Sequence, residues 1–384
     1  DGGTPSTTNP EYFGGDIPWV VIDDIQPRIT QTKSTITDLG LRKSSAKLWD
    51  KGTIILSTGA TIGEVGIAIK AMTTKQGICG IVPKDDVSAD YFYHLLVSKK
   101  RQLNTLSQGS TIKETRPPTI KKIQINLPPL PEQKKIASIL TSVDEVIENT
   151  QKQIYKLEDL KKATMNELLT KGIGHTEFRD SELGRIPKSW EILEIHKLFD
   201  DIKEFVSENS NLPLFSLTMV DGLVPKPDRY VRDFLITDKS KDNYKAVRKN
   251  ELVMNPMNLR WGAIASHHAD FDVCVSKYYN VISLRNVNLS SQFYEQLFQS
   301  KRFLNIYEKI AVGTLDEKKR VHWSDFKNIK VPVPPVDEQK IIGEVIDASA
   351  HNLKIKKKKL TLIQSLKKSL MQDLLTGKVR VKVN

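Results

Sequence analysis

A duplicated segment constrains the fold of this chain more than any other feature. The run LPPLPEQK at 127–134 returns 206 residues later as VPPVDEQK at 333–340. The match continues without a gap for some forty positions, with ten apolar pairs at the same offset: Ile136/Ile342, Ile139/Val345, Leu140/Ile346, Ile147/Leu353, Ile154/Leu360, Leu157/Ile363, Leu160/Leu366, Met165/Met371, Leu168/Leu374 and Leu169/Leu375. This period is too long for a solenoid. We therefore predict two halves, each with a variable domain followed by a similar segment.

The repeated segment is predicted to be a long helix. Its apolar residues recur at intervals of three and four, beginning with Ile136, Leu140, Val143 and Ile147. A Pro in the first turn suits a helix start, and Gly172 is a stop signal. Each helix spans roughly 60 Å at 1.5 Å per residue and must bury its apolar seam. The other copy is the nearest partner, and polar residues in the seam favour an antiparallel pair over a regular long coiled coil.

The regions before each helix are predicted to be mixed α/β. Strands are expected at 53–57 and 252–255, each followed by a turn-rich loop, and at 123–125 and 329–331. Amphipathic helices are expected at 89–106 and 291–310, each followed by a Gly-containing loop.

The predicted fold class is α+β, with two mixed α/β domains joined by two long antiparallel helices in pseudo-twofold duplicated halves. The predicted boundaries are 1–126 for the first domain, 127–173 for the central helix, 174–331 for the second domain and 332–384 for the C-terminal helix. Because the two domains share a skeleton and differ in their polar loops, they suit recognition of two different targets.

Composition restricts the class of protein. Hydrophobic residues make up 39% and charged residues 27%, which excludes wholesale disorder. No apolar run reaches the roughly 18 residues of a membrane-spanning helix. The net charge of +12 favours a polyanionic partner, although solubility alone also accounts for such a charge. The lysine run at 354–359 is interpreted either as a solvated face or as a phosphate-contacting face.

Catalytic motifs are not found in the sequence. Residues 59–66 lack the Lys of a phosphate-binding loop, and 255–258 falls short of the Asn/Asp-Pro-Pro-aromatic motif of amino-methyltransferases. His267 and His268 are adjacent and are interpreted as a surface loop. Cys79 and Cys274 are interpreted as buried free thiols in a reducing cytoplasm. A binding protein is therefore favoured over an enzyme.

The order of these motifs resembles the specificity subunit of type I restriction–modification systems. The resemblance lies in the two Pro-Pro segments that open the helices, together with GGTPS at 2–6, GGDIPW at 14–19, QGST at 108–111 and IPKSWE at 186–191. It covers essentially the whole chain. The first half has no counterpart of 186–190, so we expect the natural N-terminus to lie upstream of Asp1.

This resemblance implies that each domain reads one half of a split site in double-stranded DNA. The helices are then expected to hold the domains apart and to dock two modification subunits, which bind S-adenosylmethionine and methylate adenine. Separate restriction subunits are expected to use ATP and Mg²⁺ and to cut. The chain itself is expected to be non-catalytic, to hold no metal or cofactor, and to work in the cytoplasm.

Candidate DNA-binding residues are the polar residues on the Gly-rich loops, where the backbone can approach a groove. In the first domain they are Ser57, Thr58, Thr61, Lys75, Gln76, Lys113 and Arg116. In the second they are Asn255, Asn258, Arg260, Lys277, Lys318, Lys319 and Arg320. Trp261 is expected to anchor its domain.

Two alternatives to this function stay open on the sequence. One is a coiled-coil scaffold that does not bind DNA. The other is the DNA-recognition part of a single-chain restriction enzyme, which requires further modules outside these residues.

Overall fold

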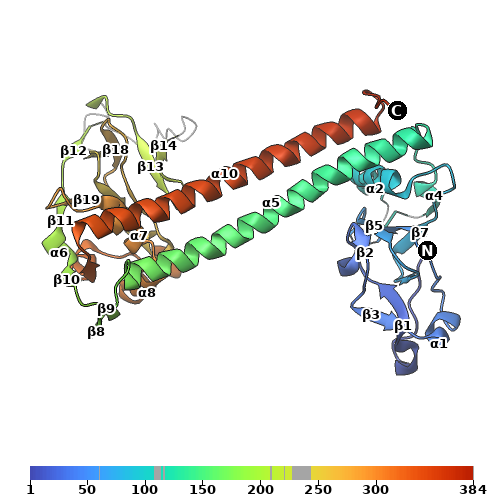
Figure 1. The fold of residues 1–384 in the computed structure, drawn as a ribbon, viewed down its shortest axis with the longest axis horizontal. Coiled ribbons are helices and arrows are strands. Elements are labelled where there is room, and N and C mark those ends of the chain that lie inside the picture. The colour runs from blue at the N-terminus through green and yellow to red at the C-terminus, as the bar shows by residue number, and fades with distance from the viewer. Residues whose placement is uncertain are drawn as a thin grey trace. The chain divides into compact units, whose positions relative to one another are not determined.

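The computed structural model describes residues 1–59, 61–107, 114–115, 117–207, 210–219, 221–226 and 244–383, without the side chain of Glu317. The chain divides into two compact units (Figure 1). Unit 1 comprises Asp1–Lys152 and Lys357–Asn384, and unit 2 comprises Gln153–Lys356. Each unit contains a mixed α/β domain and one part of each of two long helices, α5 (Leu130–Lys171) and α10 (Val336–Leu375).

The domain of unit 1 is built from short strands and helices. In chain order they are η1 (Pro10–Tyr12), β1 (Phe13–Val20), η2 (Ile22–Asp24), β2 (Arg28–Ile29), β3 (Ser34–Ile36), α1 (Asp38–Arg42), β4 (Ile54–Ser57), β5 (Val65–Ala68), β6 (Thr73–Thr74), β7 (Ile78–Ile81), α2 (Ala89–Ser98), α3 (Lys100–Thr105) and α4 (Pro117–Ile120).

The central sheet of unit 1 has the order β2-β5-β4-β7, beside a smaller sheet β3-β1-β6. Strand β4 is buried on both faces, as its continuous apolar run predicts. Ile54 and Leu56 pack with Leu96 of α2 and Leu103 of α3, whereas Ile55 belongs to the cluster on the other face. The strand predicted at 53–57 is therefore confirmed, and it delivers the following loop to the edge of the core.

The domain of unit 2 has more elements. They are β8 (Phe178–Ser181), β9 (Gly184–Pro187), β10 (Glu191–Glu194), α6 (Ile195–Leu198), β11 (Phe199–Ile202), β12 (Phe205–Val206), β13 (Phe215–Thr218), β14 (Gly222–Pro225), β15 (Tyr244–Val247), β16 (Leu252–Met254), η6 (Leu259–Trp261), β17 (Ile264–Ser266), β18 (Val273–Ser276), β19 (Asn280–Leu284), α7 (Ser291–Phe298), α8 (Lys301–Ile310), η7 (Asp316–Lys318), α9 (Trp323–Phe326) and β20 (Lys330–Val333).

The duplication extends to the centre of each sheet. Strand β16 pairs antiparallel with β17 and β19, as β4 pairs antiparallel with β5 and β7. The fourth strand differs, because β2 joins the β5 edge in unit 1 and β11 joins the β19 edge in unit 2. The predicted α+β fold with duplicated halves is confirmed, and the duplicated strands are those that precede the candidate loops.

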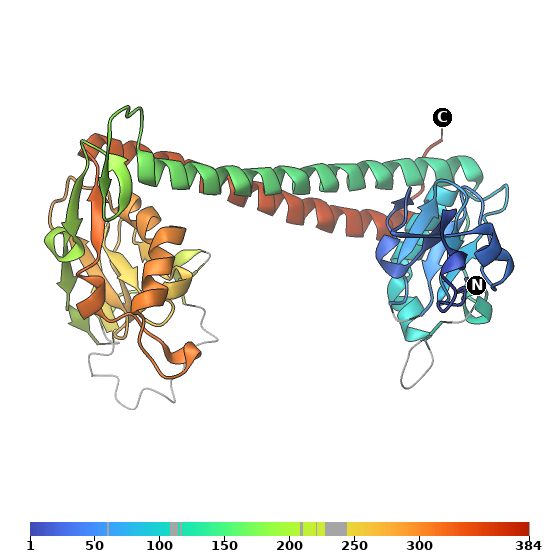
Figure 2. The same cartoon turned by 90° about the horizontal axis from the view of Figure 1, so that it is seen from below.

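The two long helices run antiparallel within each unit, as predicted (Figures 1 and 2). In unit 1, Leu140 near the start of α5 packs with Leu374 at the end of α10. In unit 2, Leu169 at the end of α5 packs with Ile342 at the start of α10. The polar seam residue Thr150 is satisfied within its own helix, since its hydroxyl donates to the Val146 carbonyl at 2.7 Å.

One local prediction is right except for a break, and another is wrong. The ranges 89–106 and 291–310 are helical as predicted, but each is interrupted, at Lys99 and at Gln299–Ser300, where Ser300 adopts an extended conformation (φ −65°, ψ 149°). Residues 123–125 form no strand in the described structure, whereas the segment predicted at 329–331 overlaps β20 (Lys330–Val333), which pairs with β10. A strand depends on a neighbour that completes its hydrogen bonds, so an apolar pattern alone does not create one.

A buried glutamine ties the start of α5 to the domain of unit 1. Gln133 is 1% exposed. Its Oε1 accepts from the Ser88 backbone N–H at 2.8 Å, and its Nε2 donates to the carbonyls of Asp86 at 3.0 Å and Pro128 at 2.8 Å. Because Ser88 is the N-cap of α2, this one side chain joins the first turns of two helices.

The second copy of this glutamine repeats the arrangement in unit 2. Gln339 is fully buried and accepts from the Ser290 backbone N–H at 3.2 Å. Its amide nitrogen donates to the Pro334 carbonyl at 2.8 Å. Ser290 is the N-cap of α7, so the duplicated glutamine has the same function in both units.

The glutamate before each glutamine binds the chain that leaves the other long helix. Glu132, at the start of α5, accepts from Arg380 at 2.8 and 2.6 Å and from the Val381 N–H at 3.2 Å. The Arg380 hydrogen bonds lower the pKa of the Glu132 carboxyl. The start of α5 is thereby fastened to the residues that follow α10.

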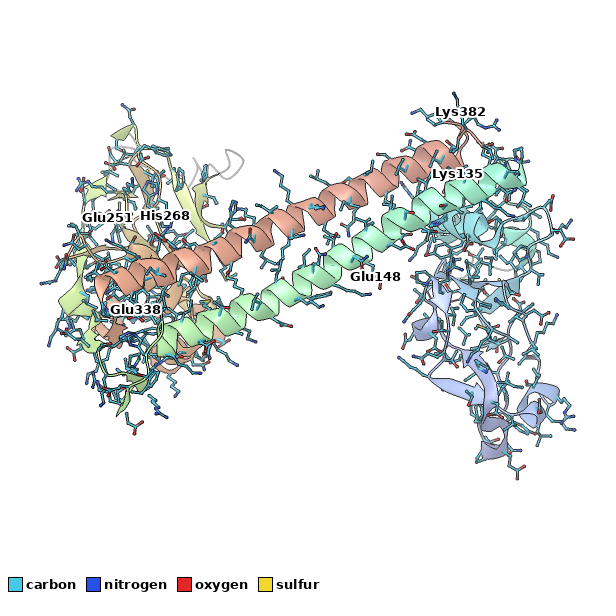
Figure 3. The ribbon with its side chains drawn as sticks, viewed as in Figure 1. Lys135, Glu148, Glu251, His268, Glu338 and Lys382 are labelled. Carbon is cyan, nitrogen blue, oxygen red and sulfur yellow. The ribbon has the colours of Figure 1, made fainter. Side chains whose placement is uncertain are left out.

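Glu338, labelled at the start of α10 in Figure 3, does the same at the end of α5. It accepts from the Ile173 N–H and from His175 Nε2, both at 2.8 Å, and from Trp190 Nε1 at 3.0 Å. Gly172 ends α5 with φ +68°, and a Cβ there would lie 2.2 Å from Glu338 Oε1. The stop signal at 172 is therefore required both by backbone conformation and by the approach of this carboxylate.

We expect replacement of either glutamine to loosen its own unit. Gln133→Ala leaves the half-buried backbone groups of Ser88 and Pro128 without this partner, and each lost hydrogen bond costs about 0.5–1.5 kcal/mol. Hydrogen exchange is then expected to rise in α2 and not in α7, and Gln339→Ala is expected to give the reverse. The exposed neighbour Lys134→Ala is the matched control. Equal loss of protection in both units from one substitution would contradict a local function for each glutamine.

Candidate nucleic-acid interface

In the first domain, three segments that carry predicted DNA-binding residues meet at one place. The loop after β4 lies against the turn between β6 and β7, since the N–H groups of Thr58 and Gly59 donate to the Gly77 carbonyl at 2.8 and 3.0 Å. Thr115 donates its N–H to the Thr58 carbonyl at 2.8 Å. Residues far apart in the sequence therefore form one continuous loop surface.

The individual residues of this surface differ in exposure. Ser57 and Thr58 are buried, and the Ser57 hydroxyl donates to the Thr61 carbonyl while accepting from the Glu64 N–H. Ser57 thus shapes the loop, whereas Thr61 and the neighbouring turn residues Lys75 and Gln76 are exposed to solvent. Lys113 and Arg116 lie outside the described residues.

In the second domain, two loops are joined by a buried arginine. Arg260, in η6 after β16, is 2% exposed in its side chain and contacts Glu308 at 2.8 Å. Its Nη2 donates to the Asp316 carbonyl at 2.6 Å, and the Val321 N–H donates to the Pro256 carbonyl at 2.9 Å. The loop at 255–262 is thereby fixed against the loop at 311–321.

This pairing brings six of the seven predicted residues of the second domain into two adjacent loops. Lys318 and Arg320 are exposed, whereas Lys319 is half-buried and its ammonium lies 2.9 Å from Asp316. The Asn255 side chain accepts from the Met257 N–H at 3.1 Å and shapes its own loop, and Asn258 is half-buried. The seventh residue, Lys277, is exposed on another turn, with its ammonium 5.9 Å from the centre of the Tyr278 ring.

Trp261 does not lie in the domain core, contrary to the expectation that it anchors the domain. Its side chain is 49% exposed, and the Arg260 guanidinium lies 5.0 Å from the ring centre. The sequence predicted that Arg260 contacts DNA and that Trp261 anchors the domain, whereas Arg260 is buried and Trp261 is exposed. The burial of Arg260 could not be predicted, because its acidic partners are 48 and 56 residues away in the sequence.

The histidines and cysteines have structural surroundings. His267 is buried and its Nε2 contacts the Phe271 carbonyl at 2.6 Å, so the surface-loop expectation holds for His268 alone. His268 (Figure 3) contacts Glu295, which raises the pKa of its imidazole. Burial raises the pKa of both Cys79 and Cys274 to about 11, so these free thiols are poor nucleophiles at neutral pH.

The described residues contain neither a metal-binding cluster nor a membrane-spanning helix. Within the described residues, no group of three or more His, Cys, Asp or Glu side chains is placed to hold a metal ion. Among the described helices, none combines the length and apolarity that crossing a membrane requires.

A second candidate site occurs twice, once in each unit. In unit 2, a groove of about 710 Å³ lies between the end of α5 and the α7–α8 corner. In unit 1, a groove of about 730 Å³ lies between the end of α10 and the α2–α3 corner. The helix residues that line them are the same positions at the 206-residue offset: Lys161/Lys367, Lys162/Lys368, Met165/Met371, Asn166/Gln372, Leu169/Leu375 and Thr170/Thr376.

Both grooves combine an apolar floor with a cationic rim. Leu297 lines one groove and Leu95 the other, from equivalent domain helices. The unit 1 groove is lined by Lys99 and Lys368 and by Lys367, whose ammonium is paired with Asp144. The rim of the unit 2 groove carries four basic residues, Lys161, Lys162, Lys301 and Arg302, against the two acidic residues Glu158 and Asp159. Such a groove suits an apolar segment flanked by carboxylates.

These features agree with the comparison to known families. A family model described as "Type I restriction modification DNA specificity domain" matches residues 1–159 and 239–365. The match covers more than half of the chain, so the chain belongs to the family of type I restriction–modification DNA specificity proteins.

Individual relatives are also named as type I specificity subunits. The chain is 28% identical over 408 residues to the type I restriction enzyme MjaIX specificity subunit of Methanocaldococcus jannaschii, with 99% of this chain and 90% of the relative covered. It is 34% identical over 170 residues to the HindI specificity subunit of Haemophilus influenzae, covering 41% and 36% of the two chains. The crystal structure of a type I S subunit from M. genitalium shares the fold, with a TM-score of 0.58 at 17% identity, covering 94% of this chain and 93% of that one.

Arg260→Ala is expected to destabilise the second domain. The substitution removes the buried guanidinium whose hydrogen bonds join the two loops, and a hydrogen bond to a charged group contributes about 1.5–3 kcal/mol. Chemical denaturation is expected to show this loss, and hydrogen exchange is expected to rise in 255–262 and 311–321. Lys318→Ala, an exposed neighbour, is the control and is expected to leave stability unchanged. Unchanged stability of Arg260→Ala with loss of binding to one half of a DNA site would instead favour a direct base contact.

Proposed function

We propose that this chain is the DNA-recognition subunit of a type I restriction–modification complex and that each domain reads one half of a split site in double-stranded DNA. The observation that carries this proposal is the duplicated sheet core with different loops. Strands β4 and β16 have the same pairing, yet the loops that follow them share neither length nor polar residues. Two such surfaces in one chain suit two unrelated half-sites.

Exposed cations and exposed or half-buried polar side chains, on the two loop surfaces and on the turn that carries Lys277, are proposed to contact DNA. Cations suit phosphates, and amide side chains suit base edges. The proposed contacts are Thr61, Lys75 and Gln76 with Lys113 and Arg116 in the first domain, and Asn258, Lys277, Lys318 and Arg320 in the second. Ser57, Thr58, Asn255, Arg260 and Lys319 are proposed to act mainly by holding these loops in place, since their polar groups are buried or bonded within the chain.

Two modification subunits are proposed to dock in the two grooves. A groove that recurs at equivalent positions fits two copies of the same partner surface, and its cationic rim favours an acidic, apolar segment. The continuation of each groove along α5 or α10 supports a helical segment as the docked element.

Catalysis and its cofactors are proposed to reside on the partner subunits. S-adenosylmethionine is assigned to the modification subunits, and ATP with Mg²⁺ to the restriction subunits. The high thiol pKa values and the internal partners of the histidines support a non-catalytic chain. Because chromosomal DNA is the proposed partner, the complex is proposed to work in the cytoplasm.

Methylation mapping tests the proposed function. The chain is expressed with modification subunits, and adenine methylation is mapped across the genome. The expected result is one bipartite motif. Lys75→Ala is expected to weaken methylation through the first half-site, and Lys318→Ala through the second. The affinity for DNA is expected to fall steeply as the salt concentration rises. Methylation that does not depend on this chain, or the absence of salt-dependent DNA binding, would favour the scaffold alternative. Turnover by the purified chain alone would favour a single-chain enzyme.

Charge reversal in the grooves is expected to remove one modification subunit at a time. Lys162→Glu acts on the unit 2 groove and Lys368→Glu on the unit 1 groove, each with at least about a tenfold loss of affinity for one subunit, about 1.4 kcal/mol. Native mass spectrometry is expected to count one bound subunit for each single variant and none for the double variant. Lys156→Glu, on α5 outside the grooves, is the control. Full occupancy in the double variant would exclude the grooves as docking sites.

A further inference from the structure

Trp261 is held in an unusual position for a large aromatic residue. It is the last residue of η6, and 49% of its side chain is exposed, although the preceding Leu259 and Arg260 are buried. Its backbone N–H donates to the Asn258 carbonyl at 3.0 Å. The following Gly262 adopts φ +88°, which turns the chain sharply back into β17. The indole therefore projects from a tight turn in which the two preceding side chains, Leu259 and Arg260, are buried.

The Arg260 guanidinium next to the indole is held in place by hydrogen bonds. The Arg260 guanidinium lies 5.0 Å from the centre of the Trp261 ring and is fixed in turn by Glu308 and by the Asp316 carbonyl. A buried guanidinium that is held against a ring by its own hydrogen bonds restricts the ring more than a solvated side chain would. The exposed surface of Trp261 is therefore presented in one orientation before any ligand binds, which reduces the entropy cost of binding.

The surroundings of Trp261 suit DNA. Met257 in the same loop and Leu315 in the adjoining loop are 42% and 56% exposed. Lys318 and Arg320, in the adjoining loop, are exposed cations. An apolar surface next to cations matches the two chemistries of a duplex groove, in which base edges are flanked by phosphates.

Trp261 has no counterpart in the first domain, and this difference indicates which kind of function the residue has. The equivalent loop after β4 is TGATIGE at 58–64, which contains no aromatic residue, and its Ile62 is buried. The docking grooves, in contrast, occur in both units. A surface for a partner shared by both halves would be duplicated, whereas a residue that reads one half-site would not.

We propose that Trp261 determines part of the sequence read by the second domain, by packing against the C5 methyl group of a thymine. That methyl group is the apolar feature that a base pair presents in the major groove, where the other features are hydrogen-bond donors and acceptors. This inference rests on the proposed function, because it requires the second domain to contact base edges.

The test removes the methyl group from either side of the contact. The half-sites are first mapped by methylation with the wild-type complex of the full chain and its modification subunits. Duplexes are then prepared in which each thymine of the second half-site is replaced in turn by deoxyuridine. At one position, uracil is expected to weaken binding of the wild-type complex about threefold to tenfold, the range for one buried methyl group. Trp261→Ala is expected to weaken binding to the thymine duplex similarly and to be insensitive to uracil at that position.

Controls separate the inference from folding and from the proposed function. Tyr278→Ala, at another exposed aromatic residue of unit 2, is expected to retain the wild-type response to uracil, and Trp261→Phe is expected to retain part of it. Equal melting temperatures exclude a folding effect. If the wild-type complex reads a bipartite site but uracil and Trp261→Ala weaken binding independently at every position, the inference is wrong and the proposed function stands. If the wild-type complex reads no bipartite site, the proposed function itself fails.

Discussion

The Glu-Gln pair at the start of each long helix is the interaction on which the rest of the structure depends. The two side chains are adjacent in sequence and bind in different directions: the glutamine to the N-cap of its own domain helix, the glutamate to the chain that leaves the other long helix. A carboxylate in the first turn is also favoured by the helix dipole. One short motif thereby fixes a domain, a helix start and a helix exit in each unit.

This arrangement separates what is duplicated from what differs. The Glu-Gln pair, the central strands and the grooves recur at equivalent positions, so they serve what both halves have in common. The loops after β4 and β16 differ in length and in chemistry. Hydrogen bonds nonetheless fix the backbone of both loops, through Ser57 in the loop after β4 and through Arg260 in the loop after β16. Exposed residues can therefore change without disturbing the scaffold, which is the physical condition for two independent specificities in one chain.

The fold was more accessible from the sequence than the site. A repeat with helical spacing specifies two long helices, and the need to bury their seams specifies their pairing. The break at Ser300 was not foreseeable, since the residues before and after it continue the amphipathic pattern and contain neither Pro nor Gly. For the site, the sequence singled out loops that the structure brings together within each domain, but side-chain exposure depends on partners distant in sequence. Arg260 is buried because Glu308 and Asp316 reach it, and Trp261 is exposed because the tight turn at Gly262 directs it outward.

The same reasoning limits what net charge says about DNA binding. The chain carries a net +12, yet several cations already have partners: Lys354 lies 3.1 Å from Asp221, Lys367 lies 2.5 Å from Asp144, and Arg380 is bonded to Glu132. Exposed pairs such as Lys354 with Asp221 are weak and can exchange a carboxylate for a phosphate, whereas Glu132 is nearly buried and its arginine is needed by the scaffold. Each phosphate contact adds about 0.9 to the salt slope, so the slope counts cations that are free to meet a duplex rather than the formal charge. The relevant electrostatics are therefore those of the exposed loop cations, which the two domains arrange differently.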